Sequence, residues 1–234
     1  MKSLNRNQLK YIAIIAMLID HIAMFFIPVS APVGFIMRVI GRITAPIMCY
    51  FIVEGYYYTK SKKDYGLRLL LFAVISQFAY SFSHYNKIFT FDFSMIFTLL
   101  LCFLMLLAEE NIDNKVLKYI VIGCLFILSF FGDWGIFAPI WVLIFFKYRE
   151  DKNEKIKGYI IVSVLLVMSN IIFALVNNYK WYSALWQLGV FIAVPLLLLY
   201  NGQSGRRNSF NKWFFYIFYP VHLIILGIIK LYII

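Results

Sequence analysis

The chain has 234 residues, of which 63% are hydrophobic and only 14% charged, and its formal net charge is +11. Soluble globular domains carry about 25% charged residues, and the longest polar stretches here, residues 147–157 and 201–212, are too short to fold alone. The composition therefore excludes a soluble enzyme or a soluble nucleic-acid-binding domain and predicts one integral membrane domain over residues 1–234.

Long apolar segments alternate with short polar breaks along the whole chain. A helix of about 20 apolar residues crosses the hydrocarbon core of a bilayer, which is about 30 Å thick. We predict an all-α transmembrane bundle of nine helices, at residues 10–29, 33–59, 67–84, 93–109, 116–131, 134–147, 157–177, 182–200 and 213–233. Only Gly132 and Asp133 separate the fifth helix from the sixth, so these two form a tight hairpin or a re-entrant pair. Cys49, Cys102 and Cys124 fall inside apolar segments without metal-ligand spacing, and we expect all three to be small buried hydrophobic residues.

The basic residues are distributed unevenly between alternate loops. With the N-terminus inside, the inner loops and inner helix ends hold 17 of the 22 lysines and arginines: Lys2, Arg6, Lys10, Lys60, Lys62, Lys63, Arg68, Lys115, Lys118, Lys147, Arg149, Lys152, Lys155, Lys157, Arg206, Arg207 and Lys212. Only Lys87, Lys180 and Lys230 fall on the outer side, and an excess of basic residues marks the cytoplasmic side. We therefore predict a multi-pass protein of a bacterial inner or plasma membrane, with its N-terminus in the cytoplasm and its C-terminus outside. This topology accounts for the net positive charge, so no nucleic-acid partner is expected.

The first predicted helix carries two ionisable residues, Asp20 and His21, in its interior. A charged side chain at the centre of a membrane-spanning helix costs about 2.5 to 3.5 kcal/mol, so such residues mark functional sites by default. A histidine changes charge near neutral pH and is a natural general base for an amine or a hydroxyl. Neighbouring residues on a helix point about 100° apart, so Asp20 and His21 can each face a different neighbour. A purely structural role is the alternative for His21.

Arg38 and Arg42 in the second predicted helix lie on one face, about 6 Å apart along its axis. Asp20 can neutralise one of them, and the other then requires a phosphate or a carboxylate, both of which suit the forked donors of arginine. The alternative is that both side chains extend to the outer headgroups. Glu54, near the inner end of the same helix, is expected to pair with a lysine or arginine of the first inner loop.

The last predicted helix carries Tyr219, Pro220 and His222. Proline frees a backbone carbonyl and kinks a helix, and such a kink can open a cavity beside the histidine. Packing alone is the alternative role for this segment. Tryptophans near helix ends, such as Trp134 and Trp181, are expected to be interfacial anchors.

Three segments in three predicted helices look like the TraX family: residues 19–22 (Ile-Asp-His-Ile), residues 38–46 followed by Glu54 and Gly55, and residues 218–223 (Phe-Tyr-Pro-Val-His-Leu). Their order and spacing match over nearly the whole chain. The family is named for the membrane enzyme that acetylates the N-terminal amine of conjugative pilin with acetyl-CoA. It is similar to the broader group of integral membrane acyltransferases of the acyltransferase-3 type.

The resemblance implies acyl transfer from acetyl-CoA, without a metal, to an amine or hydroxyl of a pilin-like peptide, a lipid or a glycan. It implies that His21 is the general base and that Asp20 orients or charges it. Arg38 and Arg42 are expected to bind phosphate or carbonyl oxygens of the donor. Lys10 resembles the basic residue that precedes the helix-one histidine in the wider group, with lysine in place of arginine, and is assigned to the same donor site.

Glu54, Tyr219 and His222 are further candidates at this site. Acetyl-CoA is cytoplasmic, whereas His21 is expected at mid-membrane or in the outer half. Either the acyl arm of the donor reaches through a pore in the bundle, or the arginine pair holds an acidic acceptor or a lipid headgroup.

Two other functions fit the same residues. A permease or channel for a small anionic solute would bind the solute with Arg38 and Arg42 and relay protons through His21. In a non-enzymatic membrane scaffold, the buried charges would only pair with one another. Membrane lipids are predicted partners, and the acyltransferase requires an acceptor as well.

Overall fold

The computed structural model describes residues 3–206 and 208–233, with the backbone alone at Ser209 and Lys212. Over these residues the chain forms α1 (Arg6–Phe26), α2 (Pro32–Gly41), α3 (Thr44–Tyr58), α4 (Lys62–Tyr85), α5 (Met95–Asn111), α6 (Lys115–Ser129), α7 (Phe137–Lys147), α8 (Lys152–Val176), the 3₁₀ helix η1 (Trp181–Ile192), α9 (Ala193–Leu198) and α10 (Ser209–Ile233). These elements cover all nine predicted segments, and the all-α membrane fold is confirmed. Of the predicted basic set, Lys2, Arg207 and the side chain of Lys212 lie outside what is described.

Six segments of the described chain are long and apolar enough to cross a membrane: α1, α2 with α3, α4, α8, η1 with α9, and α10. The other three helices, α5, α6 and α7, have 17, 15 and 11 residues. A straight crossing needs about 20 residues. Length therefore supports six of the nine predicted crossings.

Two of the predicted helices are interrupted, and each break lies just before a proline. Pro46 has no N–H to donate to the carbonyl of Arg42, and its ring crowds that carbonyl. The helix accordingly ends at Gly41 and restarts as α3 at Thr44. Pro195 likewise has no N–H to donate to the carbonyl of Phe191, near the end of η1. The chain continues as α9 from Ala193.

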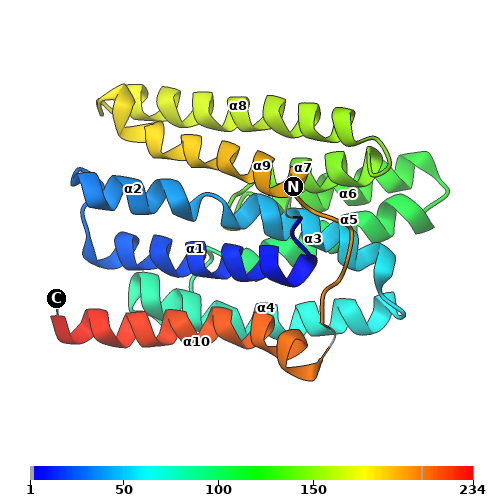
Figure 1. The fold of residues 1–234 in the computed structure, drawn as a ribbon, viewed down its shortest axis with the longest axis horizontal. Helices are drawn as coiled ribbons and strands as arrows, with labels where there is room; N and C mark the ends of the chain where they lie inside the picture. Colours follow the sequence, from blue (N-terminus) through cyan, green and yellow to red (C-terminus); the bar gives the residue numbers. More distant parts are fainter. Residues whose placement is uncertain (1–2, 207, 234) are drawn as a thin grey trace.

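The two ends of the chain lie at opposite ends of the bundle (Figure 1). The amino end of α1 shares its end of the bundle with the α3–α4, α5–α6, α7–α8 and α9–α10 connections, which carry most of the predicted inner basic residues. We call this the basic end. The carboxyl end of α10 lies at the far end. The assignment of the basic end to the cytoplasm stays a prediction.

Five helices close into a ring that contains the interior cavities. In order around the ring, α1 packs against α3, α3 against α5, α5 against α4, α4 against α10, and α10 again against α1. Outside this ring, α2, η1, α8 and α7 form a second layer that returns to α3 and α5. The ring helices therefore surround a common interior, and residues of α2 and η1 reach one of its cavities.

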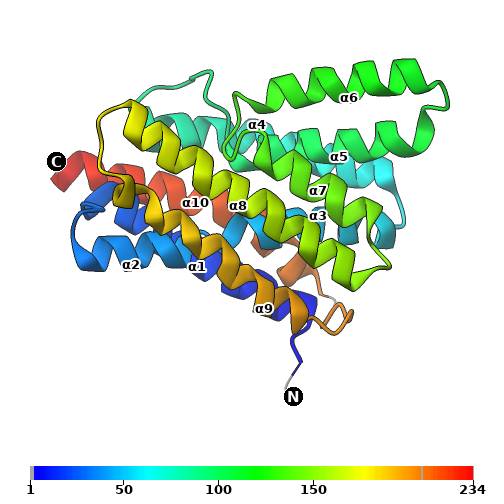
Figure 2. The same cartoon turned by 90° about the horizontal axis from the view of Figure 1, so that it is seen from above.

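Helix α6 lies at the edge of the bundle, beside α5 (Figure 2). Only Ser129 of α6 is buried. Cys49 and Cys102 are buried as predicted, but Cys124 on α6 is exposed, so that prediction was wrong for this residue. The reason is that α6 has a neighbour on one side only, and an apolar helix at the edge of a membrane bundle turns the rest of its surface to lipid.

Close packing of α2 against η1 depends on Gly189, and this gives the first testable prediction. A Cβ at residue 189 would lie 1.9 Å from the carbonyl oxygen of Val39. Gly189→Ala must push the two helices apart, and overpacking of this kind costs about 1 to 3 kcal/mol. We expect a lower melting temperature for the purified variant in detergent.

Gly123→Ala is the matched control, because a Cβ there meets nothing within 4 Å. Alanine is the better helix former by about 1 kcal/mol, so this variant should melt at the wild-type temperature or slightly above it. Equal melting temperatures for the two variants would show that α2 and η1 are not packed as described.

Candidate active site

Asp20 lies between both arginines of the second predicted helix. Its Oδ2 accepts hydrogen bonds from Arg38 Nη1 at 2.9 Å and from Arg42 Nη2 at 2.5 Å, and all three side chains are at most 12% exposed. Gly41 makes this approach possible, since a Cβ there would lie 2.1 Å from Asp20 Oδ1. One carboxylate oxygen thus serves both guanidiniums, and the second carboxylate beside the pair is that of Asp133, described below. Asp20 Oδ1 itself has no hydrogen-bond partner among the described residues.

Aromatic faces cover the two guanidiniums. Both lie over the ring of Trp186 from η1, with Cζ to centroid distances of 4.4 Å for Arg38 and 4.6 Å for Arg42. Arg42 also lies 4.7 Å from the ring of Trp134. Trp134 is therefore part of the site and not an interfacial anchor. Neither arginine extends to the headgroups, because a desolvated cation is held well by a carboxylate and an aromatic face.

All three histidines of the chain meet at this site. His21 Nδ1 and His222 Nε2 are 2.9 Å apart, which joins α1 to α10. The His84 ring, from the last turn of α4, lies edge-on to the His21 ring with the centroids 6.1 Å apart. The structure thus brings His21 and His222 together as the family resemblance implied. His21 is oriented by its hydrogen bond with His222 and donates none to the Asp20 carboxylate.

The hydrogen-bond partners assign the tautomers of the histidine pair. His222 Nδ1 is 2.8 Å from the carbonyl oxygen of Phe218, which can only accept, so this nitrogen carries the proton. In the neutral ring, His222 Nε2 is then an acceptor, and His21 Nδ1 must donate to it. Neutral His21 is left with an unprotonated Nε2. The pair therefore presents an imidazole nitrogen that can take a proton.

A cavity of about 250 Å³ opens beside these residues, lined among others by Asp20, His21, Arg42, Asp133 and Tyr219. We call it the outer cavity, because it lies beyond the middle of α1 as seen from the basic end. The Tyr219 hydroxyl accepts a hydrogen bond from the Met95 N–H at 3.3 Å. With neutral histidines, its two arginines and two aspartates balance, so the outer cavity carries no net charge.

The loop between α6 and α7 contributes Asp133 to this cavity. The loop is held in place by Thr98, whose hydroxyl donates to the backbone carbonyl of Asp133 at 2.9 Å. Burial raises the pKa of Asp133 from 3.8 to about 6, and the nearby Arg42 guanidinium opposes that shift. At neutral pH, the folded protein thus holds a carboxylate that would be more stable in water.

This pKa gives a prediction about stability against pH. A carboxyl group with a raised folded-state pKa destabilises the folded state when pH rises from the unfolded to the folded pKa, here from about 4 to about 6. Asp133→Asn removes this contribution. The melting temperature of the variant relative to wild type should therefore increase over that interval and level off above it. The control is Asp113→Asn in the exposed α5–α6 loop, for which the difference should stay flat. A flat difference for Asp133→Asn as well would contradict the burial of its carboxyl group.

Two of the candidate residues lie elsewhere. Lys10 is at the basic end of α1, over the rings of Phe51 and Phe215 at 5.7 and 5.2 Å, and lines a different cavity. Glu54 faces Arg149, with Nε to Oε1 at 3.8 Å, and accepts a hydrogen bond from the Tyr200 hydroxyl at 3.2 Å. Its cationic neighbour thus comes from the α7–α8 loop and not from the first inner loop. Neither Lys10 nor Glu54 belongs to the histidine site.

Comparison with known proteins agrees with this arrangement. A family model described as "TraX protein" matches residues 5–230, a range that includes every residue of the histidine site. The chain belongs to the TraX family. The probable fimbrial assembly protein FimC (serogroup H1) of Dichelobacter nodosus is 31% identical over 235 residues, which cover 96% of this chain and 95% of that protein. An uncharacterised protein of Rickettsia prowazekii (strain Madrid E) is 26% identical over 242 residues, covering 97% and 92% of the two chains. No solved structure matches.

Sequence reasoning missed three members of the site in this TraX protein. His84 and Trp186 were not considered, and Asp133 was noted without a role. For His84, the available signal was its rarity: the chain has three histidines, and each lies in a predicted membrane helix or at its last residue. No sequence pattern distinguishes Trp186 from the other tryptophans, since its role comes from the packing of η1 on α2.

Proposed function

We propose that this TraX protein is a membrane-embedded acyltransferase that moves an acetyl group from acetyl-CoA to an amine or hydroxyl of a peptide, lipid or glycan. The observation that carries the proposal is the histidine pair, because the carbonyl of Phe218 leaves His21 Nε2 free to accept a proton inside a cavity. A base of this kind contributes about 10²- to 10⁴-fold to a rate. A kinship with the acyltransferase-3 group forms part of this proposal.

The transfer step assigns a task to each group. His21 Nε2 takes the proton of the acceptor N–H or O–H while the acceptor atom bonds to the thioester carbonyl carbon. The C–S bond then breaks, and the leaving thiolate takes the proton from His21 Nε2, which returns the histidine pair to its neutral form. His222 holds the His21 ring in the reactive tautomer and shares the positive charge that forms on it. The phenol of Tyr219 and the Arg38 and Arg42 guanidiniums line the same cavity and, in this proposal, stabilise the negative charge that develops on the carbonyl oxygen.

The relative named as a fimbrial assembly protein makes a pilin-like peptide the first acceptor to test. Membranes with and without the protein should be compared by mass spectrometry of peptides, lipids and glycans, with labelled acetyl-CoA as the donor. One labelled acetyl group on a single class of molecule, absent when the protein is absent, is the expected result. Labelled acetate flux in vesicles, with no acetylated product and no loss of thioester, would contradict the proposal and favour a permease.

The permease alternative is weakened by the charges of the outer cavity. A site for an anionic solute needs uncompensated positive charge, whereas the carboxylates of Asp20 and Asp133 together balance the arginine pair in this cavity. The same ion pairs fit an enzyme better. They hold the guanidiniums in fixed positions, from which these groups can stabilise the negative charge that develops in a transition state.

A further inference from the structure

A second and larger cavity lies inside the same five-helix ring, at its basic end. Its volume is about 570 Å³, and we call it the inner cavity. Four cations line it: Arg6, Lys10, Arg68 and Arg206. No aspartate or glutamate lines it, and among the described residues none of the four forms an ion pair with a carboxylate. The inner cavity therefore has a surplus of positive charge that the outer cavity lacks.

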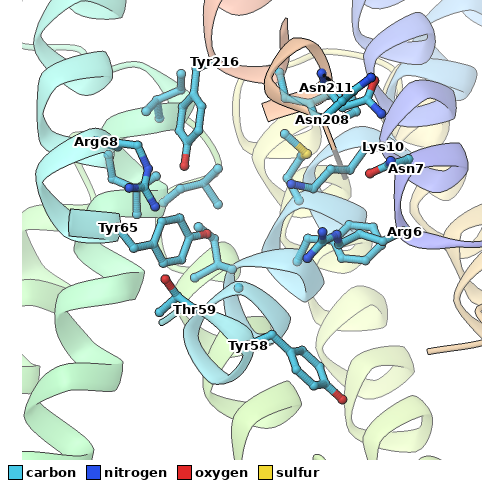
Figure 3. Close-up of a pocket in the computed structure, with 18 of the residues that line it drawn as sticks. Arg6, Asn7, Lys10, Tyr58, Thr59, Tyr65, Arg68, Asn208, Asn211 and Tyr216 are labelled. Carbon is cyan, nitrogen blue, oxygen red and sulfur yellow. Dashed lines mark hydrogen bonds between the residues drawn. The ribbon is translucent and has the colours of Figure 1, made fainter. Parts of the chain in front are cut away.

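The cations converge on one space (Figure 3). Arg6 and Lys10 extend from α1, and Arg68 extends from α4 on the opposite side. Arg68 Nε is buried without a hydrogen-bond partner among the described residues. Arginine forks and lysine ammonium groups are the side chains that proteins use to bind phosphate. An anion with several phosphate oxygens would satisfy all of them at once.

Aromatic rings complete the lining, and they indicate what the anion is attached to. Tyr65 and Tyr216 face the cavity (Figure 3), together with the rings of Phe51 and Phe215 beneath Lys10. Cations beside aromatic faces suit a nucleotide, because its base can stack on an aromatic ring and its phosphates can pair with the cations. Sites for ligands of that size measure about 300 to 1,000 Å³, a range that contains the inner cavity and excludes the outer one.

The inner cavity lies beside the loops of the basic end. Arg206 and Asn208 of the α9–α10 connection and Thr59 of the α3–α4 connection line it. Its other lining residues belong to the ring helices α1, α3, α4, α5 and α10. This position favours a ligand that enters from the aqueous side at that end over a lipid headgroup.

The two cavities are stacked end to end along the ring. On α10, Tyr216 lines the inner cavity and Tyr219 the outer one, and on α3 the same holds for Met48 and Ala45. Residues three positions apart lie one turn apart, about 5 Å along the helix. From Lys10 to His21 the distance along α1 is about 16 Å. A long, thin arm anchored in the inner cavity would therefore end near the histidine pair.

We infer that the inner cavity is a binding site for a soluble phosphate-bearing nucleotide. On the basis of the proposed function, we identify this nucleotide as the adenosine end of the acyl donor. The acyl arm of the donor then extends past the one helical turn that separates the inner cavity from the outer cavity. Its phosphates are then held by Arg6, Lys10 and Arg68, and the arginine pair Arg38 and Arg42 is left for the reacting carbonyl.

The test uses adenosine 3′,5′-bisphosphate, which has the phosphates and base of coenzyme A but no thiol or acyl group. Its binding to the full chain in phosphatidylcholine nanodiscs is measured by titration calorimetry. Arg68→Gln and Lys10→Gln should each weaken binding about tenfold or more, because each removes a charge-assisted hydrogen bond. Lys10→Arg should restore most of the affinity. Variants are compared only after their melting temperatures match that of wild type.

Lys63→Gln is the control, since Lys63 is an exposed lysine at the same end that does not line the cavity. Its affinity should stay within about twofold of wild type, as expected for a screened surface charge. Absence of binding to wild type, or equal affinity of all variants, would overturn the inference. The inference would also be overturned if Arg38→Gln lost binding of the bisphosphate while Arg68→Gln retained it.

A second set of nanodiscs contains phosphatidylglycerol at matched ionic strength, to separate a nucleotide from a lipid headgroup as the source of phosphate. Unchanged affinity for the bisphosphate is expected. Competition by the anionic lipid that is abolished in Arg68→Gln would assign the cavity to a headgroup and overturn the inference. Because the probe cannot transfer an acyl group, its binding is independent of whether acetyl transfer is found.

Discussion

His21→Asn should reduce acetyl transfer by about 10²- to 10⁴-fold, the range for loss of a general base. The asparagine amide nitrogen occupies nearly the position of Nδ1 and can still donate to His222 Nε2, so the link between α1 and α10 is retained. What it removes is Nε2. The rate should be measured with labelled acetyl-CoA at saturating acceptor, and the loss should appear in kcat with little change in the KM for the donor.

Two further measurements separate catalysis from structure. The melting temperature of His21→Asn and its affinity for adenosine 3′,5′-bisphosphate should both match wild type, because the inner cavity is untouched. In His21→Ala, added imidazole should recover part of the activity, since a small base can enter the vacated space. If His21→Asn retained activity within about threefold of wild type, His21 would not be the base.

Asp20→Asn should destabilise the protein more than any other single substitution at the site. It leaves Arg38 and Arg42 buried with only a neutral amide between them. Removing one member of a buried ion pair costs about 3 to 5 kcal/mol, because the remaining charge is desolvated without compensation. Denaturant or thermal unfolding in detergent should show this as a large shift.

A double variant tests the cause of that shift. Adding Arg38→Gln to Asp20→Asn removes one of the two uncompensated cations and should recover part of the lost stability. Glu150→Gln is the control, because the Arg149–Glu150 pair has a carboxylate side chain that is 87% exposed. An exposed pair contributes about 0 to 1 kcal/mol. A loss from Asp20→Asn no larger than that of Glu150→Gln would show that the Asp20 carboxylate does not neutralise the arginines.

Most of the fold followed from hydrophobic length alone. Apolar segments of about 20 residues have one stable form in lipid, because every backbone group must be hydrogen-bonded within the segment. The breaks after Gly41 and Ile192 were not anticipated, although Pro46 and Pro195 are visible in the sequence. The exposure of Cys124 was not predictable, since no local pattern shows that α6 has neighbours on one side only.

The residues of the site were predicted in part, but the contacts between their side chains were not. The cost of burying charge singled out Asp20, His21 and the two arginines in advance. It did not show which group each would meet, because helix partners are set by packing across the bundle. His222 thus replaced Asp20 as the partner of His21, and Lys10 lines the inner cavity, apart from the arginine pair with which it had been grouped. A full inventory of the three histidines would have added His84.

The thin partition between the two cavities has an electrical consequence. When the ring axis crosses a bilayer and water fills each cavity from its own side, the transmembrane voltage falls mainly across the one turn between Tyr216 and Tyr219. Each elementary charge that passes such a barrier exchanges about 2.3 kcal/mol with the membrane per 100 mV. An acetyl group is neutral and passes without electrical work. Acetyl transfer across this partition, as proposed above, would therefore leave an energised membrane insulated.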